Sequence, residues 1–434
     1  MANEELLFGR QLLDFQLPEI KKDLLLNRPA MKIINDEIIC ERCSTQYQKN
    51  DVCLPTGDYY CPNCVNLGRV TSSDKLYHLP EFNLFPKNIN YLVFNGTLTK
   101  AQQRLSDEVI EAILKRKSLL LWAVTGAGKT EMMFPGLNEA FKQGLRVCWA
   151  TPRIDVVLEL APRLEKVFPD LPISVLYGSN EEPYSYCQFV LCTTHQLLRF
   201  YQAFDVLIID EVDSFPYAGN KSLAFAADHS VKQNASRIYL SATPPDELTE
   251  KVPTAYLPQR FHGHPLPVPK CIYLGKWRQF VKTNRLPRKV KRVLAQGLKN
   301  KERYLIFVSE ISLLDKLKKA FNTNFKKAKC ATVYAGDEKR KEKVQDFRTG
   351  KYDVLFTTTI LERGVTIFHI NVLVIGAESK VFNWSSLVQI AGRAGRDKDH
   401  YDDQVIFYFS DYTKDLKKAV TQIKYLNQKA AEND

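Results

Sequence analysis

The chain has 434 residues, 45% hydrophobic and 25% charged, a composition typical of globular proteins, and at about 150 residues per domain the length predicts two or three domains. An excess of 61 Lys and Arg over 49 Asp and Glu gives a formal net charge of +12, which suits a polyanionic partner. No apolar stretch approaches the roughly 18 residues that span a membrane, and residues 1–5 lack a basic signal-peptide start, so a cytoplasmic location is expected.

Two Cys-x-x-Cys pairs lie near the start of the chain. They are formed by Cys40, Cys43, Cys61 and Cys64, with seventeen residues between the pairs. This spacing predicts a zinc site with four thiolate ligands in a tetrahedral shell. A reducing compartment disfavours the disulfide alternative, and Cys53 between the pairs is expected to be a bystander. The role of the site stays open, because a zinc clip is either purely structural or presents a surface to DNA or a partner.

A glycine-rich sequence, AVTGAGKT at 123–130, follows an apolar run and precedes a segment of helical character. Residues 118–124 are predicted to form a buried strand, and Lys129 to begin a helix. Glycines at 126 and 128 let backbone N–H groups approach the phosphates of ATP. Lys129 reaches the β- and γ-phosphates, and the Thr130 hydroxyl is a ligand for Mg²⁺. The predicted nucleotide-binding residues of this loop are Thr125, Gly126, Ala127, Gly128, Lys129 and Thr130.

Two carboxylates, Asp210 and Glu211, follow another apolar run at 206–209. Ligands bind at this end of the strands in open parallel sheets. Asp210 is therefore predicted to hold Mg²⁺, and Glu211 to orient or deprotonate the attacking water. The alternative for Glu211 is a solvated acid on a loop. Asp213 is expected to link the ATP site to neighbouring groups rather than to take part in chemistry.

Near the other end of the chain, the sequence Gly-Arg-Ala-Gly-Arg at 392–396 places two arginines three residues apart. On a helix, Arg393 and Arg396 would share one face and reach a γ-phosphate together. Guanidinium groups suit the charge that develops during phosphoryl transfer. The alternative is a basic surface helix.

Short apolar runs alternate with helical segments on both sides of a proline-rich stretch, which predicts two α/β lobes with doubly wound parallel sheets. Strands are predicted at 146–150, 173–176, 189–192, 206–209 and 237–240 in the first lobe, and at 304–308, 332–334, 354–357, 372–375 and 405–408 in the second. The stretch 244–269 holds seven prolines and is interpreted as a connector rather than a packed element. Apolar residues at 416, 420, 423 and 426 predict a final helix docked on a lobe. The predicted domains are 1–90, with the cysteine module at about 38–67, then a first lobe at 91–265 and a second at 266–434.

Basic residues concentrate at 276–301 and 316–329, and two aromatic residues, Trp277 and Phe280, accompany the first of these segments. Aromatic rings beside basic residues suit the stacking of bases from a single strand. The alternative for each segment is a solvated helical face. Two histidines of the proline-rich stretch, His262 and His264, are assigned no role.

Taken in order over roughly residues 95–410, the motifs resemble those of superfamily 2 helicases and translocases, which have two RecA-like lobes with ATP between them. The resemblance implies that Gln102, in the sequence Leu-Thr-Lys-Ala-Gln at 98–102, recognises adenine. It also implies that Gly364 contacts the nucleotide. Four short elements acquire expected roles in the same way: DNA-backbone contacts at 151–153 and 193–195, coupling at 241–243, and contacts with both DNA and nucleotide at 357–365.

The four-cysteine module ahead of a two-lobed motor resembles the ComFA family of late-competence DNA-uptake ATPases of Gram-positive bacteria. The proline-rich sequence at 260–269 and the element at 98–103 add to this resemblance. It implies an ATP-dependent translocase, stimulated by single-stranded DNA, that imports transforming DNA during natural competence and uses ATP, Mg²⁺ and Zn²⁺. It further implies action at the inner face of the membrane beside the uptake channel and a phosphoribosyltransferase-like partner, ComFC, and it allows a homo-oligomeric ring.

Three alternatives stay open. A PriA-like replication-restart helicase shares the motor motifs, but that family places its zinc cysteines within the motor, whereas all four precede the phosphate loop here. An RNA-dependent ATPase is compatible with the motor motifs alone. The third alternative is a zinc-anchored DNA-binding scaffold with an inactive ATP site, against which the intact Lys129, Asp210, Glu211 and Arg396 argue.

Overall fold

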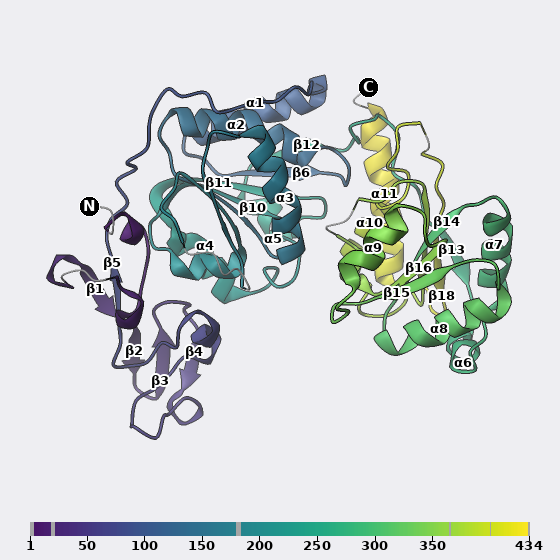
Figure 1. The fold of residues 1–434 in the computed structure, drawn as a ribbon, viewed down its shortest axis with the longest axis horizontal. Coiled ribbons are helices and arrows are strands. Elements are labelled where there is room, and N and C mark those ends of the chain that lie inside the picture. The colour runs from purple at the N-terminus through teal and green to yellow at the C-terminus, as the bar shows by residue number, and fades with distance from the viewer. Residues whose placement is uncertain (1–3, 19–21, 179–183, 364–365, 400, 433–434) are drawn as a thin grey trace. The chain divides into compact units, whose positions relative to one another are not determined.

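The computed structural model describes residues 4–18, 22–178, 184–363, 366–399 and 401–432. Contacts between Cα atoms divide the chain into two compact units. The first comprises Met1–Trp122 and Lys129–Tyr256, and the second Ala123–Gly128 and Leu257–Asp434. Each unit contains one large sheet, and every strand pair with a defined register in these two sheets is parallel (Figure 1). The prediction of two parallel α/β sheets is therefore confirmed.

The sheet of the first unit has seven strands in the order β12-β6-β11-β10-β7-β9-β8. Their bounds are β6 (Leu119–Ala123), β7 (Val147–Thr151), β8 (Ile173–Leu176), β9 (Phe189–Thr193), β10 (Phe204–Asp210), β11 (Val231–Ser241) and β12 (Thr254–Leu257). All residues of β10 are buried, as expected for an interior parallel strand covered on both faces. Because β6, β11 and β10 run in parallel as neighbours, their carboxyl ends lie at one edge of the sheet.

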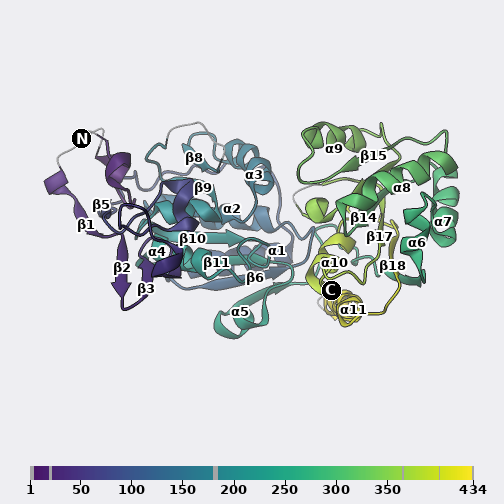
Figure 2. The ribbon, with the colours of Figure 1, turned by 90° about the horizontal axis from the view of Figure 1, so that it is seen from below.

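Helices cover this sheet on both faces. They are α1 (Lys100–Leu114), α2 (Lys129–Lys142), α3 (Ile154–Val167), the 3-10 helix η6 (Thr194–Arg199), α4 (Lys221–Ser230) and α5 (Asp246–Lys251). Figures 1 and 2 show α1 and α2 on one side of the sheet and α4 on the other. The change of side follows from the strand order. The crossovers through α2 and α3 run across the sheet in one direction, and those through η6 and α4 run in the opposite direction. Because such crossovers are right-handed, the helices of the two groups must lie on opposite faces of the sheet.

The N-terminal residues form a small module of short elements beside this lobe. These are η1 (Glu5–Leu7), η2 (Asp14–Gln16), η3 (Lys22–Leu24), β1 (Leu26–Pro29), β2 (Met31–Ile34), β3 (Glu37–Cys40), β4 (Gln46–Gln48), η4 (Lys49–Asp51), η5 (Pro62–Leu67) and β5 (Lys75–His78). Strands β2, β3 and β4 form an antiparallel sheet, and β1 pairs with β5. The four paired cysteines belong to the same buried cluster as residues of η6 and α4, so the module shares a core with the first lobe.

A buried arginine joins the N-terminal segment to the sheet. Arg146, just before β7, forms an ion pair with Glu81, and both side chains are inaccessible to solvent. The same guanidinium donates to the backbone oxygen of Phe8 at 3.0 Å and to the hydroxyl of Tyr184. A buried charge of this kind is tolerated only when its donors are satisfied.

The second unit has a six-stranded sheet in the order β13-β18-β17-β14-β16-β15. Its strands are β13 (Lys270–Tyr273), β14 (Arg303–Val308), β15 (Cys330–Val333), β16 (Val354–Thr357), β17 (Ile370–Ile375) and β18 (Val405–Phe409). Its helices are α6 (Trp277–Lys282), α7 (Arg288–Lys299), α8 (Ile311–Asn324), α9 (Arg340–Arg348), η7 (Thr359–Leu361), α10 (Trp384–Ala391) and α11 (Lys414–Glu432). Helices α6, α7 and α8 share one core with the sheet, and the predicted final helix is α11, which packs on α10. None of the described helices is both long and apolar enough to cross a membrane.

The interpretation of 244–269 as an unpacked connector is wrong. This stretch contains α5 and the edge strand β12, which lies next to β6 and buries Ala255 and Leu257. Prolines flank β12 at positions 253 and 258 instead of interrupting it, and sheet edges tolerate proline because no ladder hydrogen bond is lost there. Strand β13, immediately after the last proline of this stretch, was also not predicted.

Replacing Arg146 by Met should destabilise the first unit strongly, because Glu81 would stay buried without its partner. We expect a loss of about 3–5 kcal/mol in the free energy of unfolding. The control is Arg163→Met, which removes an exposed ion pair with Glu131 and should cost about 0–1 kcal/mol. Urea unfolding followed by circular dichroism measures both, and similar losses in the two variants would contradict the anchoring role.

Candidate ATPase and metal sites

The phosphate loop has the predicted strand, turn and helix. It connects β6 to α2, which begins at Lys129. Gly126 and Gly128 have φ angles of +81° and +77°, a region that residues with a Cβ atom rarely adopt. Thr130 follows Lys129 in the first turn of α2, where backbone N–H groups and the helix dipole favour an anion. The residues present therefore fit the phosphates of ATP.

The two candidate catalytic carboxylates lie where the sequence placed them, at the carboxyl end of β10. Asp210 is the last residue of the strand and is only 9% exposed. Its Oδ1 accepts a hydrogen bond from the backbone N–H of Glu211 at 2.9 Å. Glu211 has a φ of +52°, which is uncommon for a residue other than glycine and occurs often at functional sites. The turn at this strand end thus fixes both carboxylates at the edge where α2 also begins.

Asp213 connects this turn to the next strand, in agreement with its expected linking role. Its carboxylate accepts hydrogen bonds from the hydroxyls of Ser241 at 2.7 Å and Thr243 at 2.6 Å. Both hydroxyl-bearing residues are buried and belong to the predicted coupling element at 241–243. These two hydrogen bonds join the turn after β10 directly to the end of β11.

The two arginines at 393 and 396 are not on a helix, so the prediction that they share a helical face is wrong. Helix α10 ends at Ala391, and Gly395 has a φ of +61°, which breaks any helical path between the arginines. Arg393 is buried and donates to the backbone oxygen of Glu362 at 2.9 Å. Arg396 donates to Gly392 O at 3.1 Å and to the Thr366 hydroxyl at 3.2 Å.

Arg260 explains how this arginine-bearing turn keeps its shape. Its guanidinium donates to the backbone oxygens of Gly392 at 3.3 Å, Ala394 at 3.0 Å and Gly395. Burial lowers the pKa of Arg260 to about 10, so it stays charged at neutral pH. No role was predicted for this residue, because a single arginine in a proline-rich stretch carries no recognisable pattern.

Gln102, which is expected to contact adenine, also caps the start of α1. Its Oε1 accepts from the backbone N–H of Thr99 at 2.9 Å, while the Thr99 hydroxyl accepts from the N–H of Gln102 at 3.2 Å. This reciprocal capping box begins α1. Gly364, the remaining predicted nucleotide contact, lies outside the described residues.

Trp277 is not available for base stacking, contrary to expectation. It is 1% exposed in the core beneath α6, and its indole N–H donates to Glu378 at 3.0 Å. Phe280 on the same helix is 41% exposed and stays a candidate. The apolar face of this short helix is fixed by the sheet below it, which local sequence does not reveal.

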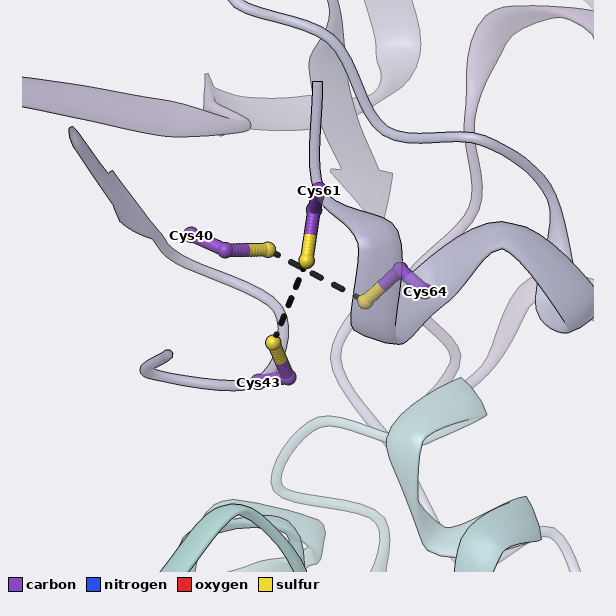
Figure 3. Close-up of side chains that lie close together, drawn as sticks. All are labelled: Cys40, Cys43, Cys61 and Cys64. Carbon is purple, nitrogen blue, oxygen red and sulfur yellow. Dashed lines mark hydrogen bonds between the residues drawn. The ribbon is translucent and has the colours of Figure 1, made fainter. Parts of the chain in front are cut away.

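Four cysteine side chains converge in the N-terminal module (Figure 3). Cys40, Cys43, Cys61 and Cys64 are fully buried, and their sulfurs all lie within 4.8 Å of one another. The sulfurs of Cys40 and Cys64 are 3.9 Å apart, and those of Cys43 and Cys61 are 3.5 Å apart. A tetrahedral site with Zn–S bonds of about 2.3 Å requires sulfurs about 3.8 Å apart. The cluster therefore fits a structural zinc ion, and Cys53 is exposed and not part of it.

A buried cation accompanies this cluster. Arg42 is 1% exposed, and its guanidinium donates to Leu198 O of η6 and to Gly68 O, each at 3.2 Å. Burial lowers the pKa of Arg42, whereas the four neighbouring sulfurs act in the opposite direction. A tetrathiolate zinc site carries excess negative charge, which this guanidinium offsets while binding the module to η6. The sequence indicated the ligands but not this arginine between them.

Families of known proteins match three parts of the chain. Residues 1–78 match the Competence protein ComFA N-terminal domain, residues 95–246 match the type III restriction enzyme res subunit, and residues 287–398 match the helicase conserved C-terminal domain. The structure of Saccharomyces cerevisiae Dbp5 bound to RNA and ADP BeF3 has a similar fold, with a TM-score of 0.54 and 14% identity. That similarity covers 76% of this chain and 91% of Dbp5. The fold and motifs thus define a superfamily 2 helicase-type ATPase with two RecA-like sheets.

Two relatives are similar over nearly the whole chain. Competence protein ComFA of Bacillus subtilis is 42% identical over 439 aligned positions, which cover 99% of this chain and 94% of the relative. Competence protein ComFA of Streptococcus pneumoniae is 40% identical over 427, covering 97% and 98%. The chain belongs to the ComFA family of competence proteins.

Replacing Cys40 and Cys43 together by Ser should abolish zinc binding and destabilise the N-terminal module, since two of the four thiolates are lost. The measurement is zinc per chain by inductively coupled plasma mass spectrometry after exhaustive dialysis. Cys53→Ser is the matched control and should retain one zinc per chain, because its thiol lies outside the cluster. Unchanged zinc content in the double variant would exclude the tetrathiolate site.

Proposed function

We propose that this protein is an ATP-dependent single-stranded-DNA translocase that drives the import of transforming DNA. The observation that carries the proposal is the turn after β10 in a chain of the ComFA family. This turn combines the paired carboxylates Asp210 and Glu211 with the link from Asp213 to Ser241 and Thr243. Such a link is what a motor requires, because hydrolysis must be coupled to movement of another element.

In this proposal each residue has a separate part in hydrolysis. Lys129 binds the β- and γ-phosphates, and Thr130 and Asp210 would hold Mg²⁺, which neutralises charge on the phosphate oxygens. Glu211 orients the attacking water and accepts its proton. Arg393 and Arg396 stabilise the charge that develops on the γ-phosphate. The contacts of Arg260 with the turn that bears both arginines support this role, because they fix the backbone from which the arginines project.

The proposed partners follow from charge and family. A net charge of +12 supports binding to a single strand, whose phosphates attract Lys and Arg. Membership of the ComFA family supports action at the cytoplasmic face of the uptake channel, a ComFC-like phosphoribosyltransferase partner and a homo-oligomeric ring. The N-terminal cysteines would hold Zn²⁺, whose thiolate shell stabilises a module with few buried residues of its own.

ATP hydrolysis by the purified full-length protein, measured without polynucleotide and with single-stranded DNA, duplex DNA or RNA, tests the proposed substrate. We expect strong stimulation by single-stranded DNA alone. RNA is included because the similar Dbp5 structure contains RNA. Preferential stimulation by RNA would place the protein among RNA-dependent ATPases, and no turnover under any condition would favour the DNA-binding scaffold.

Lys129→Ala and Glu211→Gln should each reduce stimulated turnover by about 10²-fold or more, because one removes a phosphate contact and the other the general base. Binding to single-stranded DNA without nucleotide should persist. Lys142→Ala, at the other end of α2, and Glu247→Gln, on the exposed α5, are the matched controls and should hydrolyse ATP at the unmodified rate. Normal turnover in Lys129→Ala or Glu211→Gln would refute the assignment.

A further inference from the structure

A groove lies between the cysteine module and the loop that follows β10, entirely within the first unit. Its volume is about 510 Å³, within the range of about 300–1,000 Å³ that is common for ligand sites. The module contributes Thr45, Tyr47 and Asn63. The other wall is formed by residues 215–216 and 218–220 of the loop and by the first two residues of α4, Lys221 and Ser222. Neither the ATP-site residues nor the cysteines themselves form its walls.

The groove is held together by direct contacts between its two walls. Asn63 Nδ2 donates to the Ser222 hydroxyl at 2.9 Å and to the Thr45 hydroxyl at 3.3 Å. The Tyr47 hydroxyl accepts from the backbone N–H of Asn63 at 3.3 Å and lies 3.6 Å from the sulfur of Cys61. The walls are thereby tied to the cysteine cluster, so a bound metal ion would stabilise the shape of the groove.

Phe215 is the feature of this groove that burial does not explain. Its side chain is 84% exposed, the highest value among the large apolar side chains of the described residues. The backbone around it is ordered by hydrogen bonds from Ala218 N to Ser214 O at 2.9 Å and from Asn220 N to Tyr217 O at 3.0 Å. A solvent-exposed ring on an ordered backbone, in the wall of a groove, is suited to stacking against a planar ligand.

The chemistry of the walls favours a single-stranded nucleic acid as the occupant. The groove contains one charged residue, the exposed Lys221, and no acidic residue, so its charge complements a phosphate group. Hydroxyl and amide groups of Thr45, Asn63 and Ser222 supply donors and acceptors for bases and sugars. Aromatic stacking beside a cationic contact is the combination by which proteins bind single strands without sequence preference.

The groove is also close along the chain to the candidate catalytic turn. Phe215 follows Asp213 by two residues, and the backbone N–H of Ser214 donates to Glu211 O at 2.8 Å. A base stacked on Phe215 therefore rests on the same turn that carries Glu211 and Asp213. Only a few residues of chain separate Phe215 from Glu211, the proposed general base, and from Asp213. Asp213 in turn accepts hydrogen bonds from Ser241 and Thr243.

We infer that this groove is a subsite for single-stranded DNA in which one base stacks on Phe215 and an adjacent phosphate contacts Lys221. This inference rests on the proposed single-strand translocase function and deepens it. It gives the zinc module a direct part in DNA binding, because three of its residues form one wall.

The test is binding of a fluorescein-labelled single strand to the full-length protein, measured by fluorescence anisotropy. The oligonucleotide has about 30 nucleotides, longer than the roughly 4–16 nucleotides covered by common single-strand-binding folds. Phe215→Ala should weaken binding about tenfold, and Phe215→Tyr, which keeps the ring, should restore it. Phe82→Ala is the matched control, since Phe82 is 60% exposed in the same unit but lies outside the groove, and it should bind like the unmodified protein.

Two further measurements identify the contacts. Lys221→Gln should reduce the slope of log Kd against log salt concentration by about 0.7, the value for loss of one phosphate contact on a single strand. A strand that contains 5-iodouracil should photo-cross-link to the peptide carrying Phe215, and this cross-link should disappear in Phe215→Ala.

The outcomes separate the inference from the function on which it rests. Suppose that single-stranded DNA binds and stimulates the unmodified protein, but Phe215→Ala binds it equally well and cross-links form elsewhere. The subsite would then be wrong, and the groove would be left as a docking surface for a protein. If the unmodified protein does not bind single-stranded DNA, both the subsite and the proposed function are overturned.

Discussion

The structure of the first unit depends on the burial of β10. Every residue of this strand is buried, so its residues can reach a ligand only at the carboxyl end, where the strand stops. At that point Asp210 ends the strand and Glu211 turns the backbone with a positive φ. Asp213 then returns hydrogen bonds to the end of β11. One buried strand thus fixes the positions of the carboxylates, the coupling contact and the exposed loop that follows.

The N-terminal module illustrates how a segment with little core of its own is stabilised. Its cysteine cluster adds to the buried surface of η6 and α4, and Arg42 connects the cluster to Leu198 O. Arg146 provides a second connection through Glu81 and Phe8 O. Both arginines are buried cations whose donors reach backbone oxygens, so the module is attached through directional bonds as well as apolar contact. Loss of a zinc ion held by these cysteines would therefore affect the lobe as well as the module.

Local patterns were sufficient for the elements whose environment is encoded nearby in the sequence. The strand before the phosphate loop, the helix start at Lys129 and the position of Asp210 follow from apolar runs and glycines, and all were predicted. The prediction of a helix through Arg393 and Arg396 was wrong because the turn there depends on Arg260, more than 130 residues away in the chain. The burial of Trp277 likewise depends on the sheet beneath α6. Spacing predicts neighbours along a helix, whereas these features are set by tertiary contacts.

In the proposed translocase, the groove at Phe215 and the basic segment at 276–301 would meet different requirements. The basic segment carries ten Lys and Arg and no acidic residue, and on α7 Arg288, Arg292 and Lys299 are exposed along one helical face. Such charge attracts phosphates at a distance and weakens as salt rises, but it does not fix a nucleotide in one position. A stacked ring does fix a base, and its contribution is largely independent of salt. A motor that advances along a strand needs both, because attraction keeps the strand bound while a positioned contact near Glu211 allows hydrolysis to depend on its presence.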